Sequence, residues 1–210
     1  MKLVRDLKQL KTKHVIISGD GRKEFKIIEE ICEKYNGDTK VIWFPKLSAP
    51  RKTGLSALDS VKLFPSKFHL NSIIFIVDGE FIGGRADTQI QEYLKKIGIM
   101  VVDIQPIQKA FVINCKVGHH EVVLYCIISG PETFIEEEMA RLIELELDIT
   151  IDLAGERDRS WKDRVKREIE HILHENHTST KQLIRNASSI SLEKAFPNLC
   201  VVLRNIDENY

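Results

Sequence analysis

The sequence has no long hydrophobic run, and this absence excludes one class of protein. No apolar stretch among the 210 residues approaches the roughly 20 that a membrane-spanning helix needs. The first residues also lack the apolar segment of a secretory signal peptide. We therefore expect a protein without a signal peptide and with no membrane among its partners.

The sequence has no net charge and only four cysteines. Lys plus Arg and Asp plus Glu each number 31, so no net charge draws the chain toward nucleic acid or a membrane. The four cysteines are far apart, and three lie inside apolar runs, which favours reduced buried thiols over disulfides or a zinc site. We therefore expect a cytoplasmic protein. Its composition, 43% hydrophobic and 30% charged, is typical of a folded domain.

What the sequence does contain is a repeated alternation of strand and helix. β-Branched and apolar residues predict buried strands at 14–18, 41–44, 73–77 and 99–104. Helices are predicted before and between them, at 1–12, 22–35, 54–64 and 88–97. Pro65 is expected to end the third of these helices. This order predicts a three-layer α/β fold with a mainly parallel, four-stranded sheet of Rossmann-like type.

The pattern changes after residue 105. Apolar runs at 110–116 and 121–128 predict a hairpin at the edge of the sheet. The remaining chain predicts helices at about 132–147, 160–175, 179–187 and 191–204. We therefore expect two parts: an α/β domain at 1–130 and a helical C-terminal subdomain at 131–210 packed on it.

Acidic residues follow two of the predicted strands. The strand 73–77 ends in Asp78-Gly79-Glu80, and in an extended backbone residues two apart point the same way. Asp20 follows the first strand, with Glu24 one helical turn further on. Because these strands are neighbours in the common doubly wound order, the carboxylates can meet at one edge and bind a hard cation such as Mg²⁺. The alternative is that Asp78 caps a following helix while Glu80 is solvated.

Two motifs in these segments resemble those of the TOPRIM fold. The segment from Val15 to Phe25, Val-Ile-Ile-Ser-Gly-Asp-Gly-Arg-Lys-Glu-Phe, is similar to its first motif, an acid and a glycine after strand 1. Ile76-Val77-Asp78-Gly79-Glu80 is similar to its Asp-x-Asp motif after strand 3. The second half resembles the small stand-alone and OLD-type nuclease-like branch, in which a hairpin precedes a helix opening on an acid, here Glu136. A Lys-rich helix then follows, here beginning near Trp161.

The resemblance implies phosphodiester chemistry on nucleic acid, DNA or RNA, with Mg²⁺ or Mn²⁺ as cofactor. The implied catalytic and metal-binding residues are Asp20, Asp78 and Glu80. Further metal ligands would be Glu24 and Glu136. Candidate phosphate contacts are the basic residues Arg85, Lys46, Arg51, Lys52, Lys162 and Lys166.

Two departures from the family pattern leave the function open. Asp20 stands where the family has Glu, and Glu80 stands where it has Asp. Each exchange keeps the charge but moves the carboxylate by one methylene, and a shift of about 1 Å can cost around a hundredfold in rate. The chain is therefore either a nuclease (or nuclease subunit) or a degenerate TOPRIM-like module that binds nucleic acid or a protein partner without catalysis. A third reading is a small-molecule phosphotransfer or nucleotide-binding protein.

Overall fold

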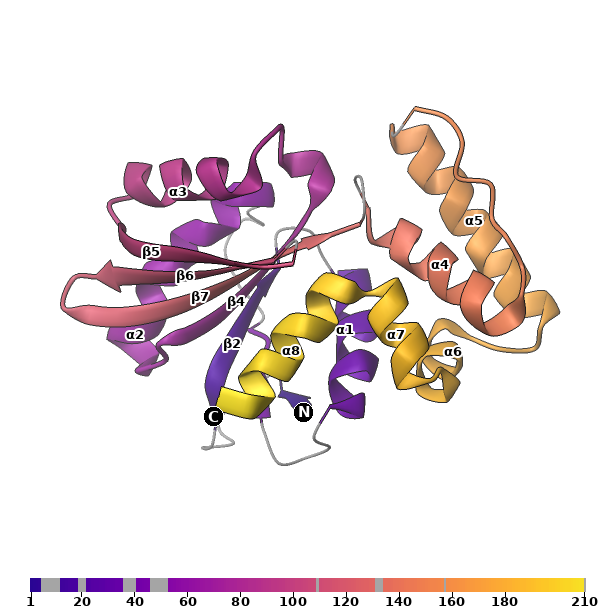
Figure 1. Cartoon of the computed structure of the whole chain (residues 1–210), viewed down its shortest axis with the longest axis horizontal. Helices are drawn as coiled ribbons and strands as arrows, with labels where there is room; N and C mark the ends of the chain where they lie inside the picture. The colour runs from indigo at the N-terminus through magenta and orange to yellow at the C-terminus, as the bar shows by residue number, and fades with distance from the viewer. Residues whose placement is uncertain are drawn as a thin grey trace.

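The fold is described from a computed structural model of the chain (Figure 1). The described residues are 1–4, 12–18, 22–35, 41–45, 53–108, 110–130, 134–156 and 158–209. Within these ranges, the description leaves out the side chains at 12, 13, 18, 22–25, 41, 208 and 209.

A seven-stranded mixed sheet runs through the molecule in the order β1-β3-β2-β4-β7-β6-β5 (Figure 1). Each of the first five strands in this order is parallel to its neighbour. These are β1 (Lys2–Val4), β3 (Val41–Trp43), β2 (Thr12–Ser18), β4 (Ser72–Asp78) and β7 (His120–Ser129). Strand β6 (Ala110–Val117) is antiparallel both to β7 and to β5 (Met100–Ile107). The predicted α/β class is confirmed.

Helices cover the two faces of the sheet, and no helix in the described part of the chain is long and apolar enough to cross a membrane. The 3₁₀ helix η1 (Gly54–Lys62), α2 (Leu63–Phe68) and α3 (Ala86–Lys96) pack on one face. Helices α1 (Arg22–Lys34) and α8 (Pro197–Asn209) lie on the other face. Helices α4 (Ile135–Leu147), α5 (Arg159–Glu175), α6 (Thr180–Asn186) and α7 (Ser189–Ala195) pack beside them at one side of the sheet and share the same core (Figure 1).

Strand β4 lies in the middle of the sheet and is buried along its whole length. Ile74 and Ile76 belong to the core on the α1 and α8 side, while Ile73, Phe75 and Val77 belong to the core on the α3 side. Fully burying such a side chain contributes roughly 1.5–3 kcal/mol. Burial on both faces explains why the sequence of this strand is apolar at successive positions rather than at alternate ones.

All four cysteines are free thiols and are buried, two in each core. Burial raises the pKa of Cys32 and of Cys200 to about 12 and that of Cys115 to about 11. It raises the pKa of Cys126 as well. Thiols with such pKa values stay protonated at neutral pH, which makes them poor nucleophiles.

The structure corrects two predicted strand and helix assignments. The helix predicted over 1–12 is wrong where the structure describes it, because Lys2–Val4 pairs with β3 as a parallel edge strand. The strand predicted at 99–104 exists as β5, but it is an antiparallel edge strand rather than a member of the parallel sheet. Tertiary pairing with a neighbouring strand overrides the local apolar spacing in both places.

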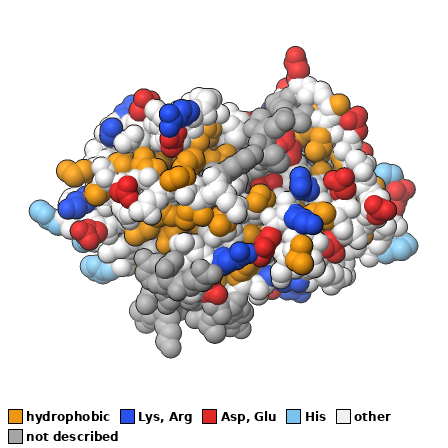
Figure 2. All heavy atoms as spheres, viewed as in Figure 1, with side chains coloured by type: hydrophobic (Ala, Val, Ile, Leu, Met, Phe, Trp, Pro, Cys, Tyr) orange, Lys and Arg blue, Asp and Glu red, His pale blue; other side chains and the backbone are white. Residues whose placement is uncertain are grey.

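Edge strand β5 leaves two large apolar side chains in solvent. Met100 is 64% and Val102 60% exposed. Figure 2 shows apolar side chains concentrated on the half of the molecule where β5, β6 and β7 lie in Figure 1.

Other boundaries also differ from the prediction. The hairpin of β6 and β7 is confirmed, but β7 lies inside the sheet, between β4 and β6. Pro65 does not end a helix; it lies in the first turn of α2, where its missing N–H has no cost. The helix predicted at 191–204 is two helices, because Pro197 interrupts the run and begins α8.

Candidate functional site

The candidate site lies at the carboxyl end of the parallel strands. Strands β2 and β4 are adjacent and parallel, with Ser18 opposite Ile76, so the predicted neighbourhood of these two strands is confirmed. Strand β7 lies on the other side of β4, with Ser129 opposite Asp78. The carboxyl ends of all three strands therefore lie at the same edge of the sheet.

Asp78 is the last residue of β4, and its side chain is only 1% exposed. The chain then turns into the short 3₁₀ helix η2 (Gly79–Phe81), which contains Glu80 with 35% of its side chain exposed. Asp78 occupies the N-cap position of η2, but its side chain makes no capping hydrogen bond. The alternative reading of Asp78 as a helix cap is therefore wrong.

Glu136 reaches the same edge from the first turn of α4, with 14% of its side chain exposed. Gly130, just after β7, makes this approach possible because its φ is +79°. A Cβ at Gly130 would lie 2.3 Å from the backbone nitrogen of Phe134, a separation that real side chains do not adopt. Glycine at this position therefore lets the start of α4 lie close to the end of β7.

The Lys162 ammonium lies among the three carboxylates. Its Nζ atom donates a hydrogen bond to Asp78 Oδ2 at 3.1 Å and lies 3.9 Å from Glu80 Oε1 and 4.0 Å from Glu136 Oε2. The same atom is 4.3 Å from the centre of the Phe134 ring, a cation–π contact. We call Asp78, Glu80, Glu136 and Lys162 the lysine-centred cluster.

Contacts at the start of α5 fix the position of Lys162. Asp158 accepts a hydrogen bond from the backbone N–H of Trp161 at 2.8 Å and so caps the helix. This bond, together with the hydroxyl of Ser160, lowers the pKa of Asp158. The Trp161 ring stacks on Phe134, with centroids 5.7 Å apart. The neighbouring residue, Lys162, is thereby held beside the first turn of α4.

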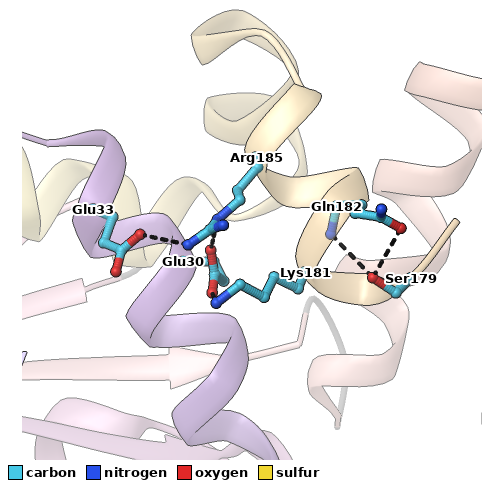
Figure 3. Close-up of polar contacts among 6 residues, drawn as sticks. All are labelled: Glu30, Glu33, Ser179, Lys181, Gln182 and Arg185. Carbon is cyan, nitrogen blue, oxygen red and sulfur yellow. Dashed lines mark hydrogen bonds and ion pairs between the residues drawn. The ribbon is translucent and has the colours of Figure 1, made fainter.

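A second charged cluster joins α6 to α1 (Figure 3). Glu30 on α1 is buried, and its carboxylate pairs with Lys181 Nζ at 2.5 Å and Arg185 Nε at 2.5 Å. Arg185 also pairs with Glu33 at 3.1 Å. We call Glu30, Glu33, Lys181 and Arg185 the glutamate-centred cluster. It anchors a C-terminal helix to the helix that follows β2.

The structure separates the predicted phosphate contacts it describes. Lys162 lies in the lysine-centred cluster. Lys166 lines a cavity of about 720 Å³ between α1, α4, α5 and α6, and Glu136 lines the same cavity. Arg85, 81% exposed, pairs with Asp87 at 2.7 Å, and this bond raises the pKa of Arg85. None of the contacts found for Arg85 in the described structure joins it to the cluster.

Several predicted residues lie outside the described part of the structure. These are Asp20, Lys46, Arg51 and Lys52. Glu24 belongs to the first turn of α1, but its side chain is not among those described. Their roles stay predictions.

Sequence reasoning missed two features of the site. It did not expect Lys162 to lie among the acids, and it did not single out Phe134. Of the three acids at the start of α4, Glu136 lies beside Lys162, whereas Glu137 and Glu138 are each only 3% exposed. Phe134 is the N-cap residue of α4, a position where the sequence offers no polar capping side chain that would have marked it.

The cluster consists of acids gathered around an ammonium. Among the described residues, no group of three or more His, Cys, Asp and Glu side chains is arranged to hold a metal ion by itself. Comparison with known proteins adds no relative: no family model, curated protein or solved structure matches this chain.

Proposed function

We propose that this chain is a Mg²⁺- or Mn²⁺-dependent, TOPRIM-like protein that acts on nucleic acid phosphodiesters, as a nuclease or a nuclease subunit. One observation carries the proposal: Asp78, Glu80 and Glu136, from two distant segments, lie within 4.0 Å of one positive charge at the carboxyl end of β4. In open α/β sheets this edge is where ligands bind.

Two features support a hard divalent cation here, although the described acids are not arranged to hold one by themselves. Carboxylate oxygens are the ligands that Mg²⁺ and Mn²⁺ prefer. The Lys162 ammonium already lies beside these oxygens and donates a hydrogen bond to Asp78. Asp78, Glu80 and Glu136 would hold the metal, with Asp20 and Glu24 as further ligands proposed from the sequence. A bound metal would neutralise charge on the phosphate and lower the pKa of an attacking water.

The remaining steps belong to side chains of this chain. Lys162 and Lys166, one helical turn apart on α5, would bind phosphate oxygens, because ammonium groups neutralise the charge of the backbone. Phe134 and Trp161 would exclude water from one side of the cluster, since they stack and are buried. Asp78 would stay in place because it is buried at the end of a buried strand.

The second candidate is a TOPRIM-like module that binds nucleic acid or a protein partner and cuts nothing. The observation that favours it is Lys162, because a covalently attached cation can replace the metal as the counter-ion of the acids. The exchanged acids at positions 20 and 80 also favour it. We further propose that the protein works in the cytoplasm, in keeping with its free thiols.

A thermal melt with millimolar Mg²⁺ or Mn²⁺ tests metal binding, because a ligand that binds only the folded state raises the melting temperature. We expect a rise for the natural chain and none for Asp78→Asn. Asp103→Asn, an exposed acid on β5, is the matched control and should respond as the natural chain does. A melting temperature that does not respond to either metal contradicts both the metal site and the nuclease.

Incubation with single- and double-stranded DNA and RNA then separates the two candidates. Metal-dependent cleavage that is lost in Asp78→Asn supports the nuclease. Cleavage that survives this substitution contradicts the placement of the site. Nucleic acid binding with a steep salt dependence but no cleavage supports the non-catalytic module.

A further inference from the structure

A cavity of about 750 Å³ lies at the amino ends of the parallel strands, at the opposite edge of the sheet from the lysine-centred cluster. Its volume is typical of small-molecule sites in proteins. The described lining comes from β2, β4, β5, β6, β7 and the turn 69–71, and no residue of α1 or α8 is among it. This edge lies away from α4 and α5 (Figure 1). The cavity is therefore separate from the candidate site described above.

One row of side chains across the sheet forms the floor of this cavity. Its members come from four neighbouring strands and lie opposite one another in the strand register: His14, Ser72, Val123 and Asn114. Side chains that lie opposite each other in register share a face of the sheet. All four residues line the cavity, so the register and the cavity lining identify the same surface.

The adjacent row on the same face has a different character. It contains three aliphatic side chains and one tyrosine, Ile16, Ile74, Val112 and Tyr125. These side chains belong to, or pack against, the core that α1 and α8 cover. Three of the four residues in the cavity floor are polar instead. Because a polar group that faces an apolar environment is unfavourable, the change at this row indicates that the floor faces polar contents.

The polar groups of the floor both donate and accept hydrogen bonds. His14 and Ser72 are 2% and 6% exposed, and His14 Nδ1 and Ser72 Oγ share a hydrogen bond of 2.7 Å. This bond fixes the positions of both groups. The Asn114 side chain, which is half-buried, adds an amide. Hydroxyl, imidazole and amide groups match the hydroxyl groups of a ligand, because these also donate and accept.

Other residues of the lining restrict the ligand further. Leu70 and Val122 are buried apolar residues of the same cavity, so part of its surface suits an apolar ring. Lys116 and Glu121, two of its exposed lining residues, lie opposite each other in register and carry opposite charges. The lining is therefore not of a single charge sign, which favours a neutral ligand.

We propose that this cavity binds a small neutral molecule with a hydroxyl-rich part and an apolar ring, the chemistry of a ribonucleoside. Ser72 and Asn114 would exchange hydrogen bonds with its hydroxyl groups. Its ring would pack on Val123 and on the buried aliphatic side chains beside it. The site needs neither a metal nor the lysine-centred cluster, so it goes beyond the function proposed above.

Titration calorimetry with adenosine and with uridine tests the proposal, and free ribose serves as a probe that lacks the ring. Asn114→Ala removes the amide of the floor, and Val123→Phe fills the space above it. Lys194→Ala, an exposed lysine on α7, is the matched control. Asp78→Asn tests whether the nucleoside binds at the carboxyl edge instead. The melting temperature of each variant shows whether it is folded.

We expect both nucleosides to bind the natural chain, Lys194→Ala and Asp78→Asn with equal affinity. Asn114→Ala should weaken binding about fivefold, as expected for the loss of one hydrogen bond. Val123→Phe should abolish binding while the protein stays folded. Ribose should bind more weakly than either nucleoside, because it offers no ring to the apolar side chains.

Four results would overturn the proposal. These are no binding of either nucleoside at millimolar concentration, unchanged binding in a folded Val123→Phe, loss of binding in Asp78→Asn, and ribose binding as tight as that of adenosine. If Val123→Phe does not fold, unchanged affinity in Asn114→Ala contradicts the proposal in its place. The Mg²⁺ response of the melting temperature is independent of all these results, so the metal site and this cavity can fail separately.

Discussion

The two charged clusters join the C-terminal helices to the rest of the molecule in opposite ways. In the glutamate-centred cluster, two carboxylates meet two cations, and the charges balance. In the lysine-centred cluster, three carboxylates meet one cation. Glu30 is buried on a helix face, whereas Asp78 is buried at the strand edge where ligands bind.

We propose from this difference that the glutamate-centred cluster serves stability and the lysine-centred cluster serves function. A balanced cluster satisfies its own charges, so its loss should destabilise the fold. Among the contacts described, the carboxylates of the lysine-centred cluster outnumber its cations, and neighbouring acids repel each other. Such repulsion is typical of sites where a ligand relieves it. Substitutions in the two clusters should therefore change stability in opposite directions.

The largest effect should come from the double variant Lys181→Ala/Arg185→Ala. This variant removes both cations that pair with the buried Glu30 carboxylate. Because a buried charge without a partner is unfavourable, we expect the unfolding free energy to fall by about 3 kcal/mol. Urea unfolding measures the loss. Lys194→Ala on α7 is the control and should change stability by less than about 0.5 kcal/mol. A double variant as stable as this control would mean that the balanced cluster contributes nothing.

A smaller loss is expected from Gly130→Ala, which moves the start of α4 away from the lysine-centred cluster. Its Cβ would meet the Phe134 backbone at 2.3 Å. Gly118→Ala is a matched control, because Gly118 also has a positive φ, +59°, but has open space around it. In urea unfolding, we expect the control to lose about 1 kcal/mol and Gly130→Ala to lose about 2 kcal/mol. Equal losses would show that α4 tolerates the displacement.

Glu80→Gln should leave the metal-free protein as stable as before or raise its unfolding free energy by up to about 1 kcal/mol. Glu80 lies 3.9 Å from Lys162, beyond hydrogen-bond distance, and its charge repels the other two acids. The same variant should reduce the rise in melting temperature caused by Mg²⁺. The exposed Glu92 on α3 provides the control Glu92→Gln. If Glu80→Gln clearly destabilised the fold, the lysine-centred cluster would serve stability, as the glutamate-centred cluster does.

The smallest effect concerns the cap that positions Lys162. Hydrogen bonds from Trp161 and Ser160 lower the pKa of Asp158 below its ordinary 3.8. The charged carboxylate therefore stabilises the fold fully above pH 3.8, and this contribution is lost as the pH falls through the lowered value. The stability difference between the natural chain and Asp158→Ala should be constant from neutral pH to about pH 4 and shrink below it. Unfolding titrations at several pH values measure this, and a constant difference at all pH values would contradict it.

Parts of the fold and site that depend on local pattern could be predicted. The buried run before Asp78 identified β4, and the preference for doubly wound order placed it beside β2. The acids at Asp78, Glu80 and Glu136 were proposed as ligands from sequence, and they lie around one ammonium. The apolar pattern of a strand and the acids at a helix start involve residues close together in the chain, so they can be recognised from the sequence.

Features that depend on distant pairing could not be predicted. The run at 99–104 has the composition of a central strand, yet β7 takes the place next to β4 and leaves β5 at the edge. Likewise, Leu3 and Val4 show helical spacing but pair with β3. Lys162 follows Asp78 by 84 residues, and only the packing of α5 on α4 brings the two together. No local signal encodes such a meeting.

The four buried cysteines give the molecule internal reporters of its own opening. Cys32 and Cys200 belong to the core beneath α1 and α8, whereas Cys115 and Cys126 belong to the core beneath η1 and α3. Their raised pKa values and burial protect them from alkylating reagents while each layer is closed. The alkylation rate of each pair therefore reports how often the helices on one side of the sheet open. The opening of the two sides can be measured separately without an added label.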